Sequence, residues 1–428
     1  MSKLRLNRII LTIMKILLVN TFETKGGAAV ACKRLCVALR KEGVDAQMLV
    51  QEKESDDKMV SVIKGSLLYK FRFIYERLII FLDNRLDRNN LFKVSIANTG
   101  TDITSLSAFK ESDIIHLHWI NQGFLSLQDL KKIFESGKKV IWTMHDMWPI
   151  TGICHHSGTC SNYQNDCGNC PLLHSPSPND LSFKTFKKKK KILLNSGIHF
   201  VACSEWLQKK AEESFLKTGN SFTNIPNPID TGSFKPGNQM QARTDLDLPL
   251  DKKLLLFGAF SISDKQKGID YMIEATQLLS DLKEDVELVL FGEKKEELSK
   301  AIGLKAHFMG YISNMETIIK LYQSIDCYVT PSLQENLPNM IMESMSCGTP
   351  CVGFRIGGIP EMITHQKTGY VADYKSAEDL ARGIRFVLHK SADPTFSQAN
   401  RDFVLANYSE KTIAERYLNL YKQSLTKK

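Results

Sequence analysis

The sequence predicts an α/β protein made of two doubly wound, Rossmann-like domains that face a cleft. Three observations predict this fold. The chain has 428 residues, which is long enough for two domains with separate cores. Apolar runs of strand length alternate with helical patterns, as they do where parallel strands are joined by helices. The alternation is interrupted once, by a segment rich in proline and glycine, and then starts again.

The N-terminal domain is expected over residues 14–228. Residues 1–13 are basic and apolar but lack a small-residue cleavage site, so we expect a dispensable extension and no secretion signal. No run reaches the roughly 18 uncharged apolar residues of a membrane-spanning helix, which favours a cytoplasmic protein. Helical patterns at 28–41 and 126–135 separate some of the expected strands. The strands are expected at 15–20, 45–50, 113–119, 138–146 and 198–204.

The C-terminal domain is expected over residues 229–405. The segment at 224–237 places three prolines and two glycines in fourteen residues, a composition typical of an interdomain linker. An amphipathic helix within 406–428 has Ile413, Tyr417 and Leu420 on one face, and we expect it to pack back onto the domains. The strands of the second domain are expected at 252–260, 286–292, 306–312, 325–331 and 349–354.

Composition and charge narrow the class of protein. Hydrophobic residues make up 43% of the chain and charged residues 24%, which is the balance of a globular protein and excludes extended disorder. The formal net charge of +9 favours anionic partners, namely nucleic acid, acidic lipid headgroups or phosphorylated small molecules. Charge alone does not choose among these three.

Two glutamates, Glu335 and Glu343, lie eight residues apart after an expected strand. Glu335 falls on a loop and Glu343 on a helix, both near the carboxyl end of that strand. A carboxylate accepts two sugar hydroxyls, so Glu343 suits a ribose. In isolation, such a pair is more typical of a structural role, in which Glu335 caps the helix and Glu343 pairs with a lysine.

The surroundings of the two glutamates favour a binding site. The chain at Leu337, Pro338 and Asn339 opens the helix, and the backbone N–H groups there suit a phosphate. A glycine turn follows at 357–358, and Lys267 precedes a helix in the loop after the domain's first strand. Together these features predict a nucleotide diphosphate site.

The two glutamates followed by "GTPCVGFRIGGIPE" resemble the family 4 glycosyltransferases of GT-B architecture, and the resemblance covers nearly the whole chain from Met14. It implies sugar transfer from a nucleotide diphosphate sugar to a glycan or lipid-linked acceptor, with retention of configuration, in surface polysaccharide assembly. It also implies that Glu343 holds the donor ribose, that Glu335 approaches the donor sugar, and that Lys267 contacts the diphosphate. We expect no catalytic metal and no other cofactor for catalysis.

One position departs from the family pattern. Many relatives have an arginine a few residues before the lysine, where this chain has Ala259. Lys265, in the same loop, is the candidate to replace it. A lysine lacks the bidentate fork of a guanidinium, so the second cationic contact to the diphosphate would be weaker.

The N-terminal domain supplies three candidate residues. Gly26 and Gly27 form a turn before a helix, and paired glycines let a ligand approach the backbone closely. His145 ends a strand, and the resemblance implies that it lies beside the reacting sugar and bonds to its hydroxyls. His116 and His118 share one face of an earlier strand. They either line the cleft or pack in the core, and both alternatives stay open.

A cysteine-rich loop at 154–170 follows the strand of His145. Four thiolates with a closing C-x2-C pair have the ligand count of a structural zinc site, although the spacing matches no standard finger. Disulfides and free thiols stay open as alternatives. The loop is similar to one in a subset of polymer-building family 4 enzymes. The four cysteines are Cys154, Cys160, Cys167 and Cys170.

Two segments combine basic and apolar residues. The segment 64–93 predicts an amphipathic helix, either at the inner surface of a membrane or packed in the core. The lysine run within 184–191 is expected to be a solvated helix face that adds to any attraction to a membrane. Two rival functions are a sugar-nucleotide epimerase and a nucleic-acid-binding protein. The second rival needs aromatic residues among the lysines, and only Phe186 is there, so we expect no nucleic acid partner.

Overall fold

The chain forms two compact units in a computed structural model that describes residues 14–63, 65–258, 264–292 and 296–426. Among these residues, unit 1 contains 14–228 and 413–426, and unit 2 contains Ile229–Thr412. The chain leaves unit 1 within the proline-rich segment 224–237. The end of unit 2 differs from the expected boundary after residue 405, because that position lies inside one continuous helix.

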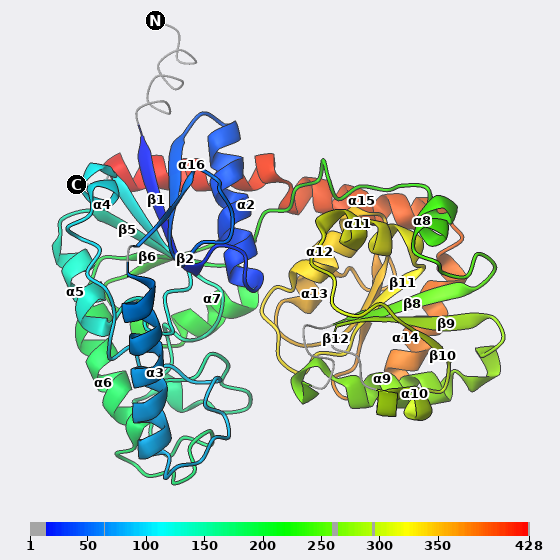
Figure 1. Ribbon diagram of the computed structural model, residues 1–428, viewed down its shortest axis with the longest axis horizontal. Coiled ribbons are helices and arrows are strands. Elements are labelled where there is room, and N and C mark those ends of the chain that lie inside the picture. The colour runs from blue at the N-terminus through cyan, green and yellow to red at the C-terminus, as the bar shows by residue number, and fades with distance from the viewer. Residues whose placement is uncertain (1–13, 64, 259–263, 293–295, 427–428) are drawn as a thin grey trace, which may run out of the picture. The chain divides into compact units, whose positions relative to one another are not determined.

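The sheet of unit 1 has seven parallel strands in the order β3-β2-β1-β4-β5-β6-β7. Figure 1 labels β1, β2, β5 and β6 of this sheet. All five strands that the sequence predicts for this unit are present. The strand order reverses between β1 and β4, so the connections leave these two strands in opposite directions along the sheet. The strands are β1 (Lys15–Phe22), β2 (Asp45–Glu52), β3 (Val60–Val62), β4 (Ile114–Leu117), β5 (Lys139–Met144), β6 (His199–Ala202) and β7 (Ser221–Asn224).

Both faces of this sheet are covered by helices, which is why its strands read as continuous apolar runs. Leu17 and Val19 of β1 belong to one core, and Ile16 and Leu18 to the core on the other face. Helices α5 and α6 pack in the first core, α2 and α16 in the second. The helices are α2 (Gly27–Lys41), α3 (Ser66–Asp83), α4 (Ser107–Glu111), α5 (Leu127–Glu135), α6 (Leu181–Leu193), α7 (Glu205–Glu212) and α16 (Glu410–Thr426).

Unit 2 has a six-stranded parallel sheet in the order β10-β9-β8-β11-β12-β13, and its order reverses between β8 and β11. Its five predicted strands are present. The strands are β8 (Lys253–Gly258), β9 (Val286–Phe291), β10 (Lys305–Phe308), β11 (Cys327–Thr330), β12 (Cys351–Phe354) and β13 (Gly369–Ala372). The helices are α8 (Gln239–Asp245), α9 (Ile269–Leu278), α10 (Glu296–Ala301), α11 (Met315–Ser324), α12 (Asn339–Ser346), α13 (Ile359–Met362), α14 (Ala377–Lys390) and α15 (Pro394–Tyr408).

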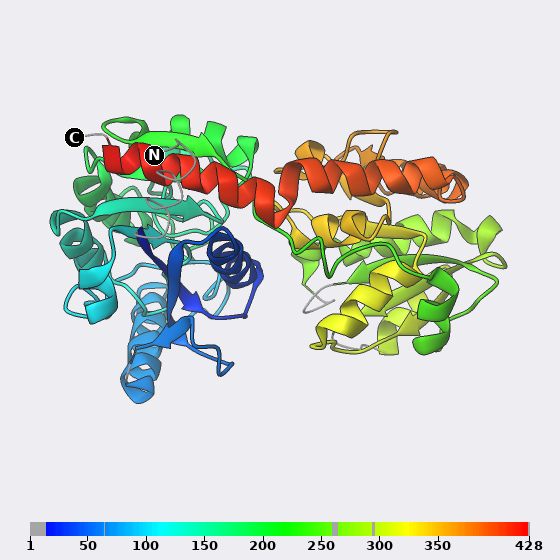
Figure 2. The ribbon, with the colours of Figure 1, turned by 90° about the horizontal axis from the view of Figure 1, so that it is seen from above.

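Helix α16 returns the chain to unit 1, as the red ribbon in Figure 2 shows. It buries Ile413, Tyr417 and Tyr421 in the same core as α2. The hydroxyl of Tyr417 lies 2.9 Å from that of Thr143 in β5. The predicted apolar face of this helix is therefore the face that packs.

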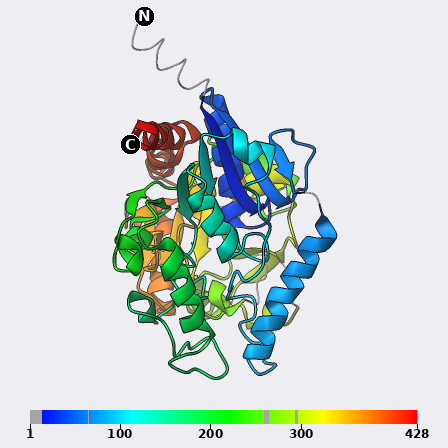
Figure 3. The same cartoon turned by 90° about the vertical axis from the view of Figure 1, so that its left-hand side faces the viewer.

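The two basic and apolar segments differ from what the sequence predicts. Helix α3 stands at one edge of unit 1 (blue in Figure 3) and ends at Asp83, not near residue 93. The core alternative is wrong for its apolar face, because Phe71 is 72% exposed and Ile74 is 61% exposed. In the lysine run, Lys189 is not solvated. It is fully buried, and its ammonium donates to the carbonyls of Trp148 at 2.6 Å and Thr151 at 3.1 Å.

In the described part of the chain, no helix is both long enough and apolar enough to cross a bilayer.

Candidate functional site

The candidate residues of unit 2 gather where its strand order reverses. In an open parallel sheet, ligands bind outside the carboxyl ends of the strands at such a point. The 3-10 turn Lys265–Lys267 follows β8, and residues 331–338 follow β11. We call residues 331–338 the β11–α12 loop. These two segments belong to the neighbouring strands at which the order reverses.

Lys267 and Glu335 form an ion pair across this point. The Nζ atom of Lys267 lies 2.7 Å from Oε1 of Glu335. The negative charge of Glu335 raises the pKa of Lys267 despite its partial burial, so the lysine is cationic at neutral pH. The Lys267 side chain is 38% exposed. A phosphate that reached it would compete with Glu335 for the ammonium.

Two glycines let other segments approach the β11–α12 loop closely. A Cβ atom on Gly268 would lie 1.8 Å from the carbonyl oxygen of Pro331, and one on Gly357 would lie 1.9 Å from that of Glu335. Both glycines have positive φ values, +76° and +56°, which side chains disfavour. Any larger residue at either position would displace the loop that carries Glu335.

Backbone hydrogen bonds hold the same loop from both sides. Leu333 donates to the carbonyl of Gln266 at 2.8 Å, and Gly358 donates to the carbonyl of Asn336 at 2.7 Å. These bonds connect the loop to the turn of Lys267 and to the glycine turn after β12. The position of Glu335 is therefore set by main-chain contacts on two sides.

Helix α12 begins directly after this loop. Its N-cap residue is Pro338, which makes no side-chain cap to the N–H groups of the first turn from Asn339. Leu337 is buried, so its side chain is not available to a ligand. An uncapped helix start carries partial positive charge and suits an anion.

Glu343 lies one turn further along α12 and is partly exposed. It accepts a hydrogen bond of 3.0 Å from the hydroxyl of Tyr322 in α11. Burial raises the pKa of Tyr322 well above its usual value, so the phenol stays a donor. Glu335 pairs with Lys267, and no side chain at the N-cap residue Pro338 caps α12, so the structural alternative in which Glu335 caps the helix is not what the structure shows. That Glu343 pairs with a lysine stays a prediction.

Two positions, Lys265 and Ala259, bear on a second cationic contact to the diphosphate. Lys265 is exposed at the start of the turn after β8. Ala259 lies outside the described residues. The placement of Lys265 on the same turn as Lys267 fits the substitution that the sequence suggests.

In unit 1 the glycine turn lies at the carboxyl end of β1, again where the strand order reverses. Gly26 has φ of +87°, and a Cβ atom built on it would meet nothing within 4 Å. Gly27 is the first residue of α2, and the N-cap Gly26 offers no side chain to its first turn. The turn is thus exposed and leaves room above the start of α2.

A buried carboxylate, Glu23, supports this turn, and the sequence did not single it out. It accepts hydrogen bonds from Nζ of Lys33 at 2.7 Å and from the backbone N–H groups of Glu54 and Ser55 at 2.7 and 3.0 Å. Burial opposes ionisation, but these donors and the Ser55 hydroxyl bring the pKa of Glu23 to about 2. Glu23 therefore ties the glycine turn to the segment after β2 and to α2.

His145 follows β5 and contacts two protein side chains through its ring. Its Nε2 lies 2.9 Å from Nδ1 of His118, and its Nδ1 lies 3.5 Å from Sγ of Cys203. Burial lowers the pKa of His145 to about 4, so the ring is neutral at neutral pH. Nε2 of His118 is buried and has no hydrogen-bond partner within the described residues.

His116 and His118, expected on one face, have different roles. The ring nitrogens of His116 lie 2.7 Å from the hydroxyls of Tyr421 and Thr143, inside the core. His118 instead contacts His145 at the end of the neighbouring strand. The core role therefore holds for His116, whereas His118, which is also buried, contacts the candidate residue His145. That His118 lines the cleft stays a prediction.

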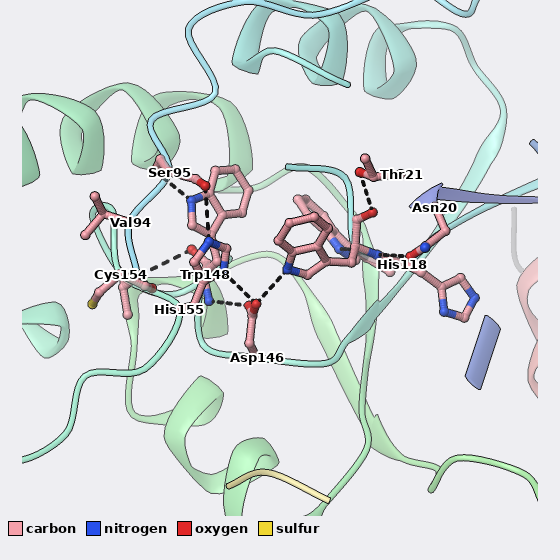
Figure 4. A network of polar contacts seen from close by, with 12 residues as sticks. Asn20, Thr21, Val94, Ser95, His118, Asp146, Trp148, Cys154 and His155 are labelled. Carbon is pink, nitrogen blue, oxygen red and sulfur yellow. Dashed lines mark hydrogen bonds and ion pairs between the residues drawn. The ribbon is translucent and has the colours of Figure 1, made fainter. Parts of the chain in front are cut away.

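Asp146 is the centre of a polar network (Figure 4). Its Oδ2 accepts from Nε1 of Trp119 at 2.9 Å and lies 2.6 Å from Nδ1 of His155, while its Oδ1 accepts from the N–H of Trp148 at 2.8 Å. Burial opposes ionisation of Asp146, but the interactions with His155 bring its pKa to about 2. His155 belongs to the cysteine-rich loop, so Asp146 connects that loop to the ends of β4 and β5.

The cysteine-rich loop does not fit a metal site in this structure. All ten cysteines of the chain lie among the described residues, and none forms a disulfide. No three His, Cys, Asp or Glu side chains within the described residues are grouped so that they could hold a metal ion. Structural zinc stays a prediction without support from this arrangement.

Two family models match the chain in succession. The model described as Glycosyltransferase Family 4 matches residues 25–233, and the model described as Glycosyl transferases group 1 matches residues 241–403. The first range falls almost entirely in unit 1 and the second lies in unit 2.

Individual proteins are similar to the chain as well. An uncharacterised glycosyltransferase of Methanocaldococcus jannaschii is 25% identical over 362 residues, which are 78% of this chain and 90% of that protein. A GDP-mannose-dependent alpha-(1-6)-phosphatidylinositol dimannoside mannosyltransferase of Mycobacterium tuberculosis is 30% identical over 185 residues, which are 42% of this chain and 47% of that protein. The structure of sucrose-phosphate synthase from Thermosynechococcus elongatus has the same fold, with a TM-score of 0.69, 19% identity and coverage of 96% of this chain and 98% of that one.

Proposed function

Since this chain is a two-domain glycosyltransferase of the GT-B, family 4 and group 1 type, we propose that it moves a sugar from a nucleotide diphosphate donor to a glycan or lipid-linked acceptor. The relative from Mycobacterium tuberculosis uses GDP-mannose and acts on a phosphatidylinositol dimannoside, which supports both halves of the proposal. We further propose that the transfer retains the configuration of the sugar and serves surface polysaccharide assembly. The matches favour neither an epimerase nor a nucleic-acid-binding protein.

The observation that carries the proposal is the ion pair of Lys267 and Glu335 at the strand reversal of unit 2. A donor diphosphate attracts the Lys267 ammonium away from Glu335. The lysine then stabilises the negative charge that grows on the leaving diphosphate as the sugar departs. Glu335, no longer paired with Lys267, accepts hydrogen bonds from hydroxyls of the donor sugar. The same pair thus divides its two charges between the two parts of the donor.

The start of α12 and Glu343 complete the donor site in this proposal. The backbone N–H groups of Leu337 and Asn339 donate to phosphate oxygens, while Pro338 has no N–H to donate. Lys265 adds a second cation from the exposed turn. Glu343 accepts the two ribose hydroxyls, while the Tyr322 hydroxyl holds its carboxylate in place.

On the acceptor side, we assign Gly26, Gly27 and His145 to binding. A neutral His145 offers one N–H donor and one acceptor, which suits a sugar hydroxyl better than a charged ring does. Both ring nitrogens of His145 already contact protein side chains. The 3.5 Å contact to the Cys203 sulfur is the weaker of the two, so a sugar hydroxyl would replace that contact. His118 then holds the ring through the other nitrogen.

The chemistry of this site relies on fixed charges and N–H donors, so we propose that catalysis requires no metal and no other cofactor. A lipid-linked acceptor would place the enzyme at the cytoplasmic face of a membrane. Peripheral contact there is part of the proposal.

The test is a donor screen with purified protein that measures nucleotide release with and without glycan or lipid-linked acceptors. Lys267→Ala is expected to lower kcat/KM about a hundredfold, because it removes a charge contact to the leaving group. Glu343→Gln is expected to raise the KM for the donor about tenfold, the cost of one charged hydrogen bond. Lys283→Ala, an exposed lysine of unit 2 outside the site, is the matched control.

Two results would overturn the assignment. Full activity in both site variants would remove Lys267 and Glu343 from the donor site. Conversion of the donor to an epimer without transfer to any acceptor would favour the epimerase instead.

A further inference from the structure

A groove of about 770 Å³ lies on unit 1, apart from the residues proposed for sugar transfer. Residues of α5 and α6 line it, and α3 contributes Tyr75 and Ile79. Its lining contains lysines, apolar side chains, uncharged polar side chains and one carboxylate, Glu135. The glycosyl transfer proposed above gives no role to any of these residues.

One stripe of α6 supplies the basic lining. Lys184, Lys188 and Lys191 occur at the spacing i, i+4 and i+7, which places them on one face of the helix. All three side chains are exposed, and none forms an ion pair, hydrogen bond or ring contact within the described residues. Three like charges at this spacing repel one another, which destabilises the helix unless a counter-charge binds.

The other lysines of the same run are already used. Lys187 and Lys190 pair with Asp166 at 2.9 and 3.0 Å, and Lys189 is buried. The lysines of α6 therefore differ in their partners according to the face of the helix on which they lie. Asp166 pairs with the lysines outside the groove lining, whereas within the described residues no carboxylate pairs with the three lysines that line the groove. Glu135, which also lines the groove, pairs with Lys131 at 3.6 Å.

The apolar lining continues onto an exposed surface. Tyr75 lines the groove and is 45% exposed, and on the same helix Phe71, Ile74 and Leu78 are exposed as well. Across the groove, Phe134 of α5 also faces into it. A contiguous apolar strip beside a row of cations is the pattern of a surface that meets acidic lipid headgroups.

We propose that this groove seats an anionic phospholipid at the surface of a bilayer. The headgroup phosphate contacts Lys184, Lys188 and Lys191, and the start of an acyl chain lies against Tyr75 and Phe134. A free phosphate would satisfy the lysines but leave the apolar lining in water. A second copy of this chain, with its formal charge of +9, would bring more cations to the groove. The phospholipid surface matches both halves of the lining at once.

The proposal rests on the peripheral membrane contact proposed above and names its surface. Its test contains neither donor nor acceptor, so its failure would leave the proposed sugar transfer untouched. The full chain is sedimented with vesicles of equal parts phosphatidylglycerol and phosphatidylcholine, and with vesicles of phosphatidylcholine alone. Wild-type protein is expected to bind only the anionic vesicles, and less at high salt. A triple variant, Lys184→Gln with Lys188→Gln and Lys191→Gln, is expected to partition on the order of a hundredfold less.

The matched control removes the same charge elsewhere on unit 1, by Lys58→Gln with Lys209→Gln and Lys217→Gln, three exposed lysines outside the groove. It is expected to bind almost as well as wild type. An equal loss in both triple variants would show attraction by net charge alone and overturn the groove. A groove variant that binds the anionic vesicles as well as wild type does would also overturn the groove.

A separate variant tests the apolar half. Phe71→Ser with Ile74→Ser changes two exposed side chains, and it is expected to weaken binding to the anionic vesicles while circular dichroism stays unchanged. Titration with inorganic phosphate, followed by chemical shifts of the groove, separates the two anion sources. Saturable phosphate binding without any vesicle binding would identify a free-anion site and refute the lipid.

Discussion

Glu23 shows how much a single buried residue contributes at the glycine turn. Its side chain is fully buried and accepts bonds from Lys33 and from two backbone N–H groups. The pKa of a glutamate is 4.5 when exposed and about 2 here. Because the folded-state pKa is depressed, the stabilisation is complete above pH 4.5 and is lost as the pH falls toward 2.

Glu23→Gln is therefore expected to lower the free energy of unfolding at pH 7 by up to about 3 kcal/mol. The variant should also lose part of the acid sensitivity between pH 4.5 and 2. Urea unfolding at a series of pH values measures both effects. Glu54→Gln is the control, because Glu54 is 38% exposed and its contribution is small. An unchanged slope of stability against pH in Glu23→Gln would contradict the assignment.

Individual residues also show where pattern reasoning ends. The lysine run predicts a solvated face, yet the helical period turns Lys189 inward beneath Trp148, with its ammonium 3.3 Å from the centre of the indole ring. Lys267 and Glu335 could be predicted together, since both follow neighbouring strands of one sheet. Tyr322 and Cys203 could not, because their contacts with Glu343 and His145 depend on how separate elements pack.

At the scale of elements, two glycines control the β11–α12 loop. Gly357→Ala is expected to lower the free energy of unfolding by more than the roughly 1–2 kcal/mol that a left-handed backbone costs a residue with a side chain. The reason is that the added Cβ would also overlap the carbonyl oxygen of Glu335. The loop must then shift, which should raise the KM for the donor. Thermal unfolding and calorimetric donor binding measure the two consequences.

Gly310→Ala separates these two causes. Gly310 also has a positive φ, +66°, but a Cβ there would meet nothing within 4 Å. It should therefore show the backbone strain without the loss of donor affinity. If both variants lost stability and affinity equally, the close contact at Glu335 would have no special role.

The elements divide into those a sequence predicts and those it does not. β1 and β8 are runs of apolar residues buried on both faces, so their pattern is strong. β3 has three residues and β7 four, both at the edge of the sheet, where few buried side chains are needed. β13 begins with a glycine. The sequence does not predict the end of α3 at Asp83, because the apolar spacing continues beyond Asp83 while the helix does not.

At the scale of the whole molecule, the chain crosses between its units twice, after Pro228 and after Thr412. Unit 1 is consequently built from two distant parts of the sequence. Its second part, α16, inserts two tyrosines beside the sheet, and their hydroxyls lie 2.9 Å from Thr143 and 2.7 Å from His116. Removing them would leave a cavity and a buried imidazole nitrogen without a partner.

Tyr417→Ala with Tyr421→Ala should therefore destabilise unit 1 alone, by an amount on the order of several kcal/mol. Hydrogen exchange followed by mass spectrometry reads each unit separately. Peptides from β1 and β4 should exchange faster, while those from β8 and β11 should not change. Leu425→Ala alters the same helix at a position that is 41% exposed, and should affect neither set. Equal acceleration in both units would mean that they unfold together, and α16 would then not belong to unit 1 energetically.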